Sequence, residues 1–124
     1  MTITVPLTPS VKTKAYNMIQ YKSGVHRNNL EPIMLLALSR IEPIYNENGH
    51  ALVVTSTDDG FHREGSLHYV GRAVDIRIRD LDDHIVRKVH EKIVKTLKHL
   101  DRSFQVILKS THIHIEHERR GRKT

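Results

Sequence analysis

Apolar residues between positions 30 and 41 recur every three or four residues, the spacing of an amphipathic helix. Asn29 precedes this pattern and is a typical N-cap residue, so we expect the helix to begin after it. Pro43 and the NENG segment that follows it should end the helix, because proline removes a backbone donor and the turn-forming residues do not continue the pattern.

A second helix is predicted by a stripe of apolar residues with i, i+4 spacing. The stripe consists of Leu81, Ile85, Val89, Ile93 and Leu97. Asp80 is the expected N-cap, and Lys98 and His99 add positive side chains to the last turn, where they complement the helix dipole.

The remaining apolar segments have the character of strands. Residues 51–56 form a short β-branched run, and residues 73–79 alternate strictly between aliphatic and charged side chains. Residues 104–109 and 111–118 are two further strands with a single residue between them, which predicts an antiparallel hairpin. The order of helices and strands therefore predicts an α+β fold, with a small antiparallel sheet and helices packed on one face.

Composition limits the architecture and the partners. The 124 residues are enough for one domain, which we expect to span residues 1–124. The net charge of +6 favours polyanionic partners: nucleic acid, anionic lipid or an anionic cell-wall polymer. The longest apolar run, IMLLAL, is far too short to span a membrane, and the N-terminal residues lack the pattern of a signal peptide. We therefore expect synthesis in the cytoplasm.

Histidine is abundant and cysteine is absent. The chain has ten His and no Cys, so a zinc site would have to use His nitrogens and carboxylate oxygens. His112, His114 and Glu116 alternate along the last strand and should share one face. Asp75 lies on the polar side of an earlier strand, seven residues after His68. If these strands are neighbours, His68, Asp75 and His114 form three corners of a zinc site with water at the fourth, although the alternation alone also fits a half-exposed strand.

The segment GSLHYVGRAVDI resembles the SxHxxGxAxD signature of the zinc D-Ala-D-Ala carboxypeptidase family. The superfamily also includes L-alanyl-D-glutamate endolysins of phages and the hedgehog signalling domain. Every fixed position of the signature is matched, by Ser66, His68, Gly71, Ala73 and Asp75. The later segment HIHIE is similar to the second motif of the family. The resemblance implies a hedgehog-like or DD-peptidase-like α+β fold that binds Zn²⁺ through His68, Asp75 and His114.

The resemblance also implies how a substrate is held and cleaved. Ser66 would contact a substrate carboxylate or carbonyl, and Arg63 or His62 would replace the arginine that many members carry upstream. Many members place a carboxylate three residues before the last zinc ligand as general base, but this chain has Thr111 there. His112, as in members with an HxH motif, would then be the acid/base or an oxyanion-stabilising group, and Glu116 is the alternative base.

These features predict a zinc metallopeptidase that hydrolyses peptidoglycan stem peptides at D-Ala-D-Ala or L-Ala-D-Glu bonds, as a carboxypeptidase or an endopeptidase. Without a signal peptide, it would reach the cell wall after release, as a phage endolysin or a virion-associated lysin does. The absence of a carboxylate at position 111 supports an alternative, a non-catalytic zinc-stabilised module that binds cell wall or protein. A metal-dependent nuclease is a third hypothesis based on charge, but no helix has a base-reading pattern, so nucleic acid is the weaker expectation.

Overall fold

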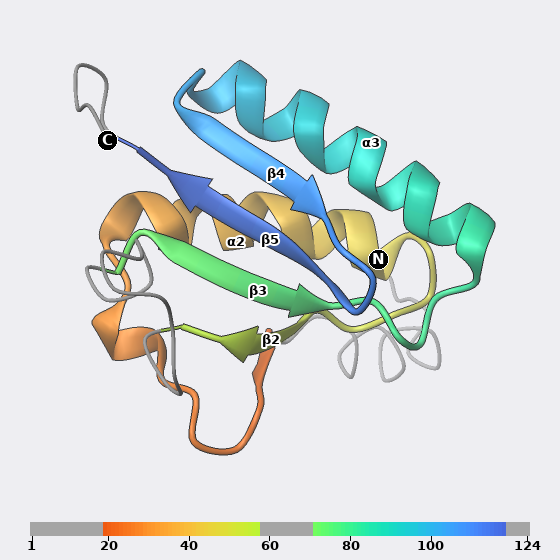
Figure 1. Cartoon of the computed structure of the whole chain (residues 1–124), viewed down its shortest axis with the longest axis horizontal. Coiled ribbons are helices and arrows are strands. Elements are labelled where there is room, and N and C mark those ends of the chain that lie inside the picture. The colour runs from red at the N-terminus through yellow and green to blue at the C-terminus, as the bar shows by residue number, and fades with distance from the viewer. Residues whose placement is uncertain (1–18, 58–70, 119–124) are drawn as a thin grey trace, which may run out of the picture.

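The computed structural model describes residues 19–57 and 71–118, which form a five-stranded sheet and two α-helices (Figure 1). This arrangement confirms the predicted α+β class. The elements are β1 (Gln20–Tyr21), the 3-10 helix η1 (Arg27–Asn29), α2 (Pro32–Asn46), β2 (Val53–Ser56), β3 (Ala73–Arg77), α3 (Asp83–Leu100), β4 (Phe104–Leu108) and β5 (His112–His117).

The strand order is β1-β2-β3-β5-β4, and the sheet is mixed. β1 pairs with β2 in parallel, whereas the other three pairs are antiparallel. The prediction of a purely antiparallel sheet is therefore wrong at one edge. The physical reason is that α2 lies between β1 and β2 in the chain, and a crossover helix returns the chain in the same direction.

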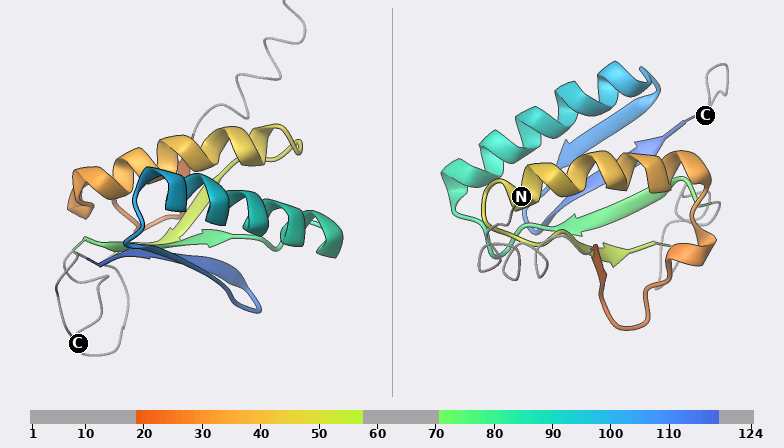
Figure 2. Two further views of the ribbon diagram at one scale, coloured as in Figure 1. Left: turned by 90° about the horizontal axis from the view of Figure 1, so that it is seen from above. Right: turned by 180° about the vertical axis from the view of Figure 1, so that it is seen from behind.

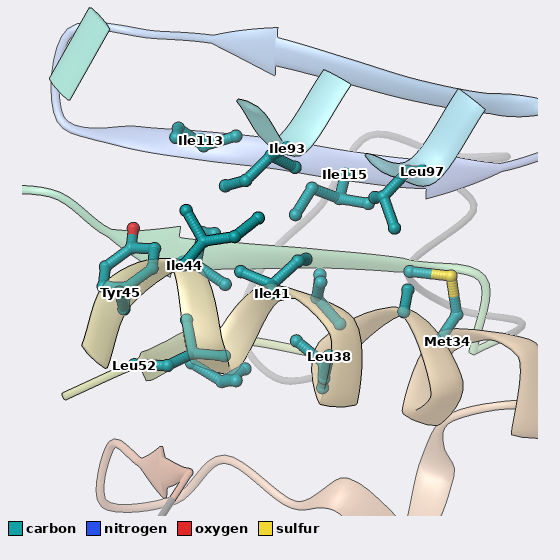
Figure 3. Packing of buried hydrophobic residues seen from close by; sticks show 14 of the residues in the cluster. Met34, Leu38, Ile41, Ile44, Tyr45, Leu52, Ile93, Leu97, Ile113 and Ile115 are labelled. Atoms are coloured by element: carbon teal, nitrogen blue, oxygen red, sulfur yellow. The ribbon is translucent and has the colours of Figure 1, made fainter. Parts of the chain in front are cut away.

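Both helices cover the same face of the sheet, as predicted (Figure 2). The core lies between them and the inward-facing residues of the strands (Figure 3). Val74, Ile76, Ile113 and Ile115 are all fully buried there, so the alternation predicted for β3 and β5 is confirmed. The opposite face of these two strands carries their charged and polar side chains, which are partly exposed.

The predicted boundaries of α2 are wrong at both ends. Its N-cap is Glu31, because Asn29 belongs to the preceding 3-10 helix. Pro43 lies inside the helix, which continues to Asn46. Proline removes the donor that would normally bond to the Ser39 carbonyl, but both residues are on the exposed side, where water can replace that bond.

The N-cap of α3 is Asp82 instead of the predicted Asp80. The chain first makes a turn in which the Leu81 N–H donates to the Ile78 carbonyl, and this delays the helix. The C-terminal prediction is confirmed, since Lys98 and His99 lie in the last turn. Among the described residues, no helix is long and apolar enough to cross a membrane.

The predicted hairpin is confirmed. β4 and β5 are antiparallel neighbours, and the Lys109 N–H donates to the His112 carbonyl across the turn, with an N···O distance of 2.8 Å. The turn projects beyond the C-terminal end of β3 (Figure 1). It therefore brings the first residue of β5 close to the point where the chain leaves β3 for α3.

Candidate metal centre

The polar face of β3 and β5 brings together the candidate residues that lie in the described part of the chain. The two strands are adjacent and antiparallel, and their register places Asp75 directly opposite His114. His112 and Glu116 flank His114 on the same face of β5, as predicted, while Ile113 and Ile115 anchor that strand in the core from behind. A rigid, centrally placed strand pair therefore presents two imidazoles and two carboxylates.

His114 lies between the two carboxylates. Its Nδ1 is 2.9 Å from Asp75 Oδ1, and its Nε2 is 2.8 Å from Glu116 Oε1. The side chains of His114 and Asp75 are only 13% and 15% exposed. The hydrogen bond to Asp75 raises the pKa of His114, with a further contribution from Glu116, although partial burial of the ring opposes this increase. The site thus stabilises a positive charge at the position of His114.

His112 approaches the same carboxylate from the other side. Its Nε2 is 3.6 Å from Asp75 Oδ1, which is too long for a hydrogen bond but within ion-pair range. Its Nδ1 is 2.9 Å from Thr111 Oγ1. Thr111 cannot act as the general base, but this contact allows it to orient the ring of His112.

The donor set of Asp75 and His114 fits a zinc ion. Two ligand atoms that each lie about 2.1 Å from a tetrahedral zinc ion are about 3.4 Å apart. The Asp75 Oδ1 and His114 Nδ1 atoms, at 2.9 Å, need to separate by only about half an ångström to reach that spacing. Within residues 19–57 and 71–118, no three His, Asp or Glu side chains form a complete metal-binding group, so a third ligand would have to come from another part of the chain.

His68, Ser66 and Arg63 lie outside the described residues, so their assigned roles stay predictions. Gly71, the glycine of the same motif, is described and has a φ of 76°, a left-handed conformation that favours glycine. Its carbonyl accepts a hydrogen bond from the Glu31 N–H, with an N···O distance of 2.9 Å. The glycine of the motif is therefore attached to the start of α2.

His117 does not belong to this face, because it is one residue away from Glu116 on β5 and points the other way. Its ring packs edge-on against Phe104, and its Nε2 is 3.1 Å from Asp101 Oδ2. The hydrogen bond from the Ser103 backbone and the contact with His117 both lower the pKa of Asp101. Asp101 and His117 thus form a second carboxylate–imidazole pair, well separated in sequence from Asp75.

The sequence prediction did not identify a neighbouring cavity of about 770 Å³, which we call the hairpin cavity. It lies where the end of β3, the first turns of α3 and the β4–β5 turn meet, and its walls include His112 and Thr111. Its cationic lining residues are Lys22, Arg77, Arg79, Arg87 and Lys109. One feature of the sequence could have indicated the cationic lining of this cavity. The alternation of residues 73–79 puts Arg77 and Arg79 on the same side as Asp75.

The fold and this face define a small α+β domain whose central strands carry a His/Asp/Glu cluster. No protein-family model matches the chain, and no curated protein matches it either.

Proposed function

We propose that this protein is a zinc-dependent peptidase that hydrolyses peptidoglycan stem peptides. The observation that carries the proposal is the pairing of Asp75 with His114, which are opposite each other on adjacent strands with their oxygen and nitrogen atoms 2.9 Å apart. Asp75 is also the last residue of the SxHxxGxAxD motif, whose resemblance to the zinc D-Ala-D-Ala carboxypeptidase family supplies the substrate class. The hedgehog-like fold is part of the same proposal.

Asp75 and His114 would hold the metal together with His68. Nδ1 of His114 would be the coordinating atom because it faces Asp75, and this would leave Nε2–H to donate to Glu116. A carboxylate on the second nitrogen of a metal-binding histidine fixes the tautomer and increases the basicity of the ligand. Glu116 is therefore assigned to positioning His114, and this contact makes it the weaker candidate for the general base.

Bound zinc would supply a water of lowered pKa and polarise the scissile carbonyl. His112 is then the general base, because its Nε2 points toward Asp75 and it also borders the hairpin cavity. For Nε2 to accept a proton, the neutral ring must carry its hydrogen on Nδ1, which donates to Thr111 Oγ1. Nε2 can later return the proton to the leaving amine.

The proposal is tested by metal content and peptide cleavage. The purified protein is expected to hold about one zinc ion per chain by elemental analysis and to cleave a synthetic stem pentapeptide, detected by mass spectrometry. Chelation should abolish cleavage and added zinc should restore it. His68→Ala should lose both zinc and activity, whereas His84→Ala, on the exposed surface of α3, should retain both. Full zinc content and full activity in His68→Ala would refute the site assignment.

The roles of His112 and Glu116 are separated by a second comparison. His112→Ala is expected to retain zinc but to lower kcat by about 10²–10⁴-fold, the usual contribution of a general base. Glu116→Gln is expected to weaken zinc binding by about 10–100-fold, with kcat nearly normal once zinc is saturating. The reverse pattern, with kcat lost in Glu116→Gln and retained in His112→Ala, would make Glu116 the base.

A non-catalytic module with the same fold is the second candidate. It is favoured by Thr111 at the position where related peptidases carry a carboxylate, and by the contact that ties Glu116 to His114. A protein that holds zinc and binds cell-wall fragments without cleaving any of the stem-peptide bonds would select this candidate.

A further inference from the structure

The hairpin cavity differs from the metal centre in its charge. Five cationic side chains line it, from four separate segments of the chain, and Asp83 is the only carboxylate among its described lining residues. Arg77 forms an ion pair with Asp80 at 3.5 Å. For Lys22, Arg79, Arg87 and Lys109, no ion pair with another described residue is present. The described lining therefore carries more positive than negative charge, which attracts an anionic group.

The cavity borders the proposed catalytic site at His112. His112 lines the cavity, and its Nε2 is only 3.6 Å from Asp75 Oδ1. An extended peptide advances by about 3.3 Å per residue, so a peptide bound at Asp75 and His114 would reach the cavity within a few residues. A group that binds in the cavity would thus belong to the same substrate chain.

The residue types that line the cavity also favour one class of anionic ligand over another. Ile78, Leu81, Val86 and Leu108 contribute apolar surface beside the cationic residues, which suits a ligand with both carboxylates and small apolar side chains. Apart from the His112 imidazole, no aromatic side chain is present among the described lining residues, so the cavity offers little stacking surface for nucleic-acid bases. These properties favour an acidic peptide over an oligonucleotide.

We propose that the hairpin cavity is a substrate subsite in which Arg79, Arg87 and Lys109 bind a free carboxylate group of the stem peptide. This carboxylate group lies close to the scissile bond in the peptide chain. The inference rests on the proposed peptidase function for the identity of the peptide. It adds a specificity determinant beyond Ser66 and Arg63. Stem peptides carry such carboxylates on D-glutamate and at their C-terminus, and charge-assisted hydrogen bonds to guanidinium groups would select them.

The first test measures binding to the zinc-free protein, so that it is independent of catalysis. NMR titration with the synthetic pentapeptide L-Ala-D-Glu-L-Lys-D-Ala-D-Ala is expected to shift the side-chain signals of Arg79 and Arg87. Amidation of the peptide carboxylates should weaken binding about fivefold or more, as should Arg79→Gln or Arg87→Gln, which remove one charge pair each. Lys88→Gln is the matched control, since Lys88 is exposed on α3 beside Arg87 but does not line the cavity.

The second test uses the zinc-loaded protein. Arg79→Gln is expected to raise KM about fivefold for the pentapeptide with little change in kcat, and to leave KM for the amidated peptide unchanged. Equal affinity for both peptides, or shifts confined to other surfaces, would overturn the subsite, as would tighter binding of a single-stranded oligonucleotide at the same arginines. Cleavage without cavity binding would refute the subsite alone, whereas cavity binding without cleavage would support the subsite and refute the peptidase function.

Discussion

Gly71→Ala is expected to destabilise the protein by about 2–5 kcal/mol and to lower the melting temperature by roughly 10–20 °C. Gly71 has a φ of 76°, a left-handed conformation that an alanine adopts only with strain. A Cβ at this position would also lie 2.2 Å from the Asn29 carbonyl oxygen and 3.2 Å from the Glu31 nitrogen. Both are backbone atoms of the segment that leads from η1 into α2, so the clash cannot be relieved by rotating a side chain. Thermal and urea denaturation followed by circular dichroism would measure the loss.

Gly49→Ala is the matched control for this substitution. Gly49 has a similar φ of 83°, but a Cβ there would meet no atom within 4 Å. It should therefore show only the conformational penalty of about 1–2 kcal/mol. Equal losses for the two variants would mean that the close approach of Gly71 to α2 contributes nothing. A larger loss for Gly71→Ala would explain in physical terms why glycine occupies this position of the motif.

Asp75→Asn is expected to remove zinc and to lower the rate of peptide cleavage by at least about a thousandfold, or ~4 kcal/mol of transition-state stabilisation. The carboxylate is the proposed zinc ligand, and its Oδ1 is also the atom toward which both His112 and His114 are directed. Asparagine has nearly the same shape but no charge, so the change acts on the metal and the imidazoles more than on packing. Elemental analysis and kinetics on the stem pentapeptide would measure the two effects.

Asp101→Asn provides the matched control, because Asp101 also pairs with an imidazole, that of His117, at 3.1 Å. This pair is outside the proposed centre, so zinc content and kcat should be unchanged even if stability falls slightly. The zinc-free forms of both variants should give native circular dichroism spectra. If Asp75→Asn retained zinc and activity while folded, the proposed metal centre would be wrong.

The strands that carry the candidate centre were predictable from local sequence. β3 and β5 alternate with a period of two, and burial of Val74, Ile76, Ile113 and Ile115 forces the intervening polar residues onto the other face. The apolar stripe of α3 was equally predictable from the sequence, and Val89, Ile93 and Leu97 are all fully buried in the structure. These predictions succeeded because each depends on the repeat of a single element and on the need to bury its apolar side.

The helix ends and the edge strand were less predictable, because they depend on neighbours. Asn29 is a good N-cap by type, yet it lies in a 3-10 turn, and the carbonyl of Gly71 accepts the N–H of Glu31 at the actual start of α2. Pro43 is tolerated because it is exposed. β1 consists of only Gln20 and Tyr21, and its parallel pairing follows from the crossover through α2.

By itself, the sequence determined which side chains are available and on which face of each strand they lie: Asp75 on one strand, and His112, His114 and Glu116 on another. Only the tertiary structure decided that Asp75 is directly opposite His114, that Glu116 contacts the second nitrogen of that ring, and that the cations of the hairpin cavity converge beside His112. The physical reason is that alternation is a local property of one strand, whereas register and convergence arise when segments distant in the chain pack around a shared core.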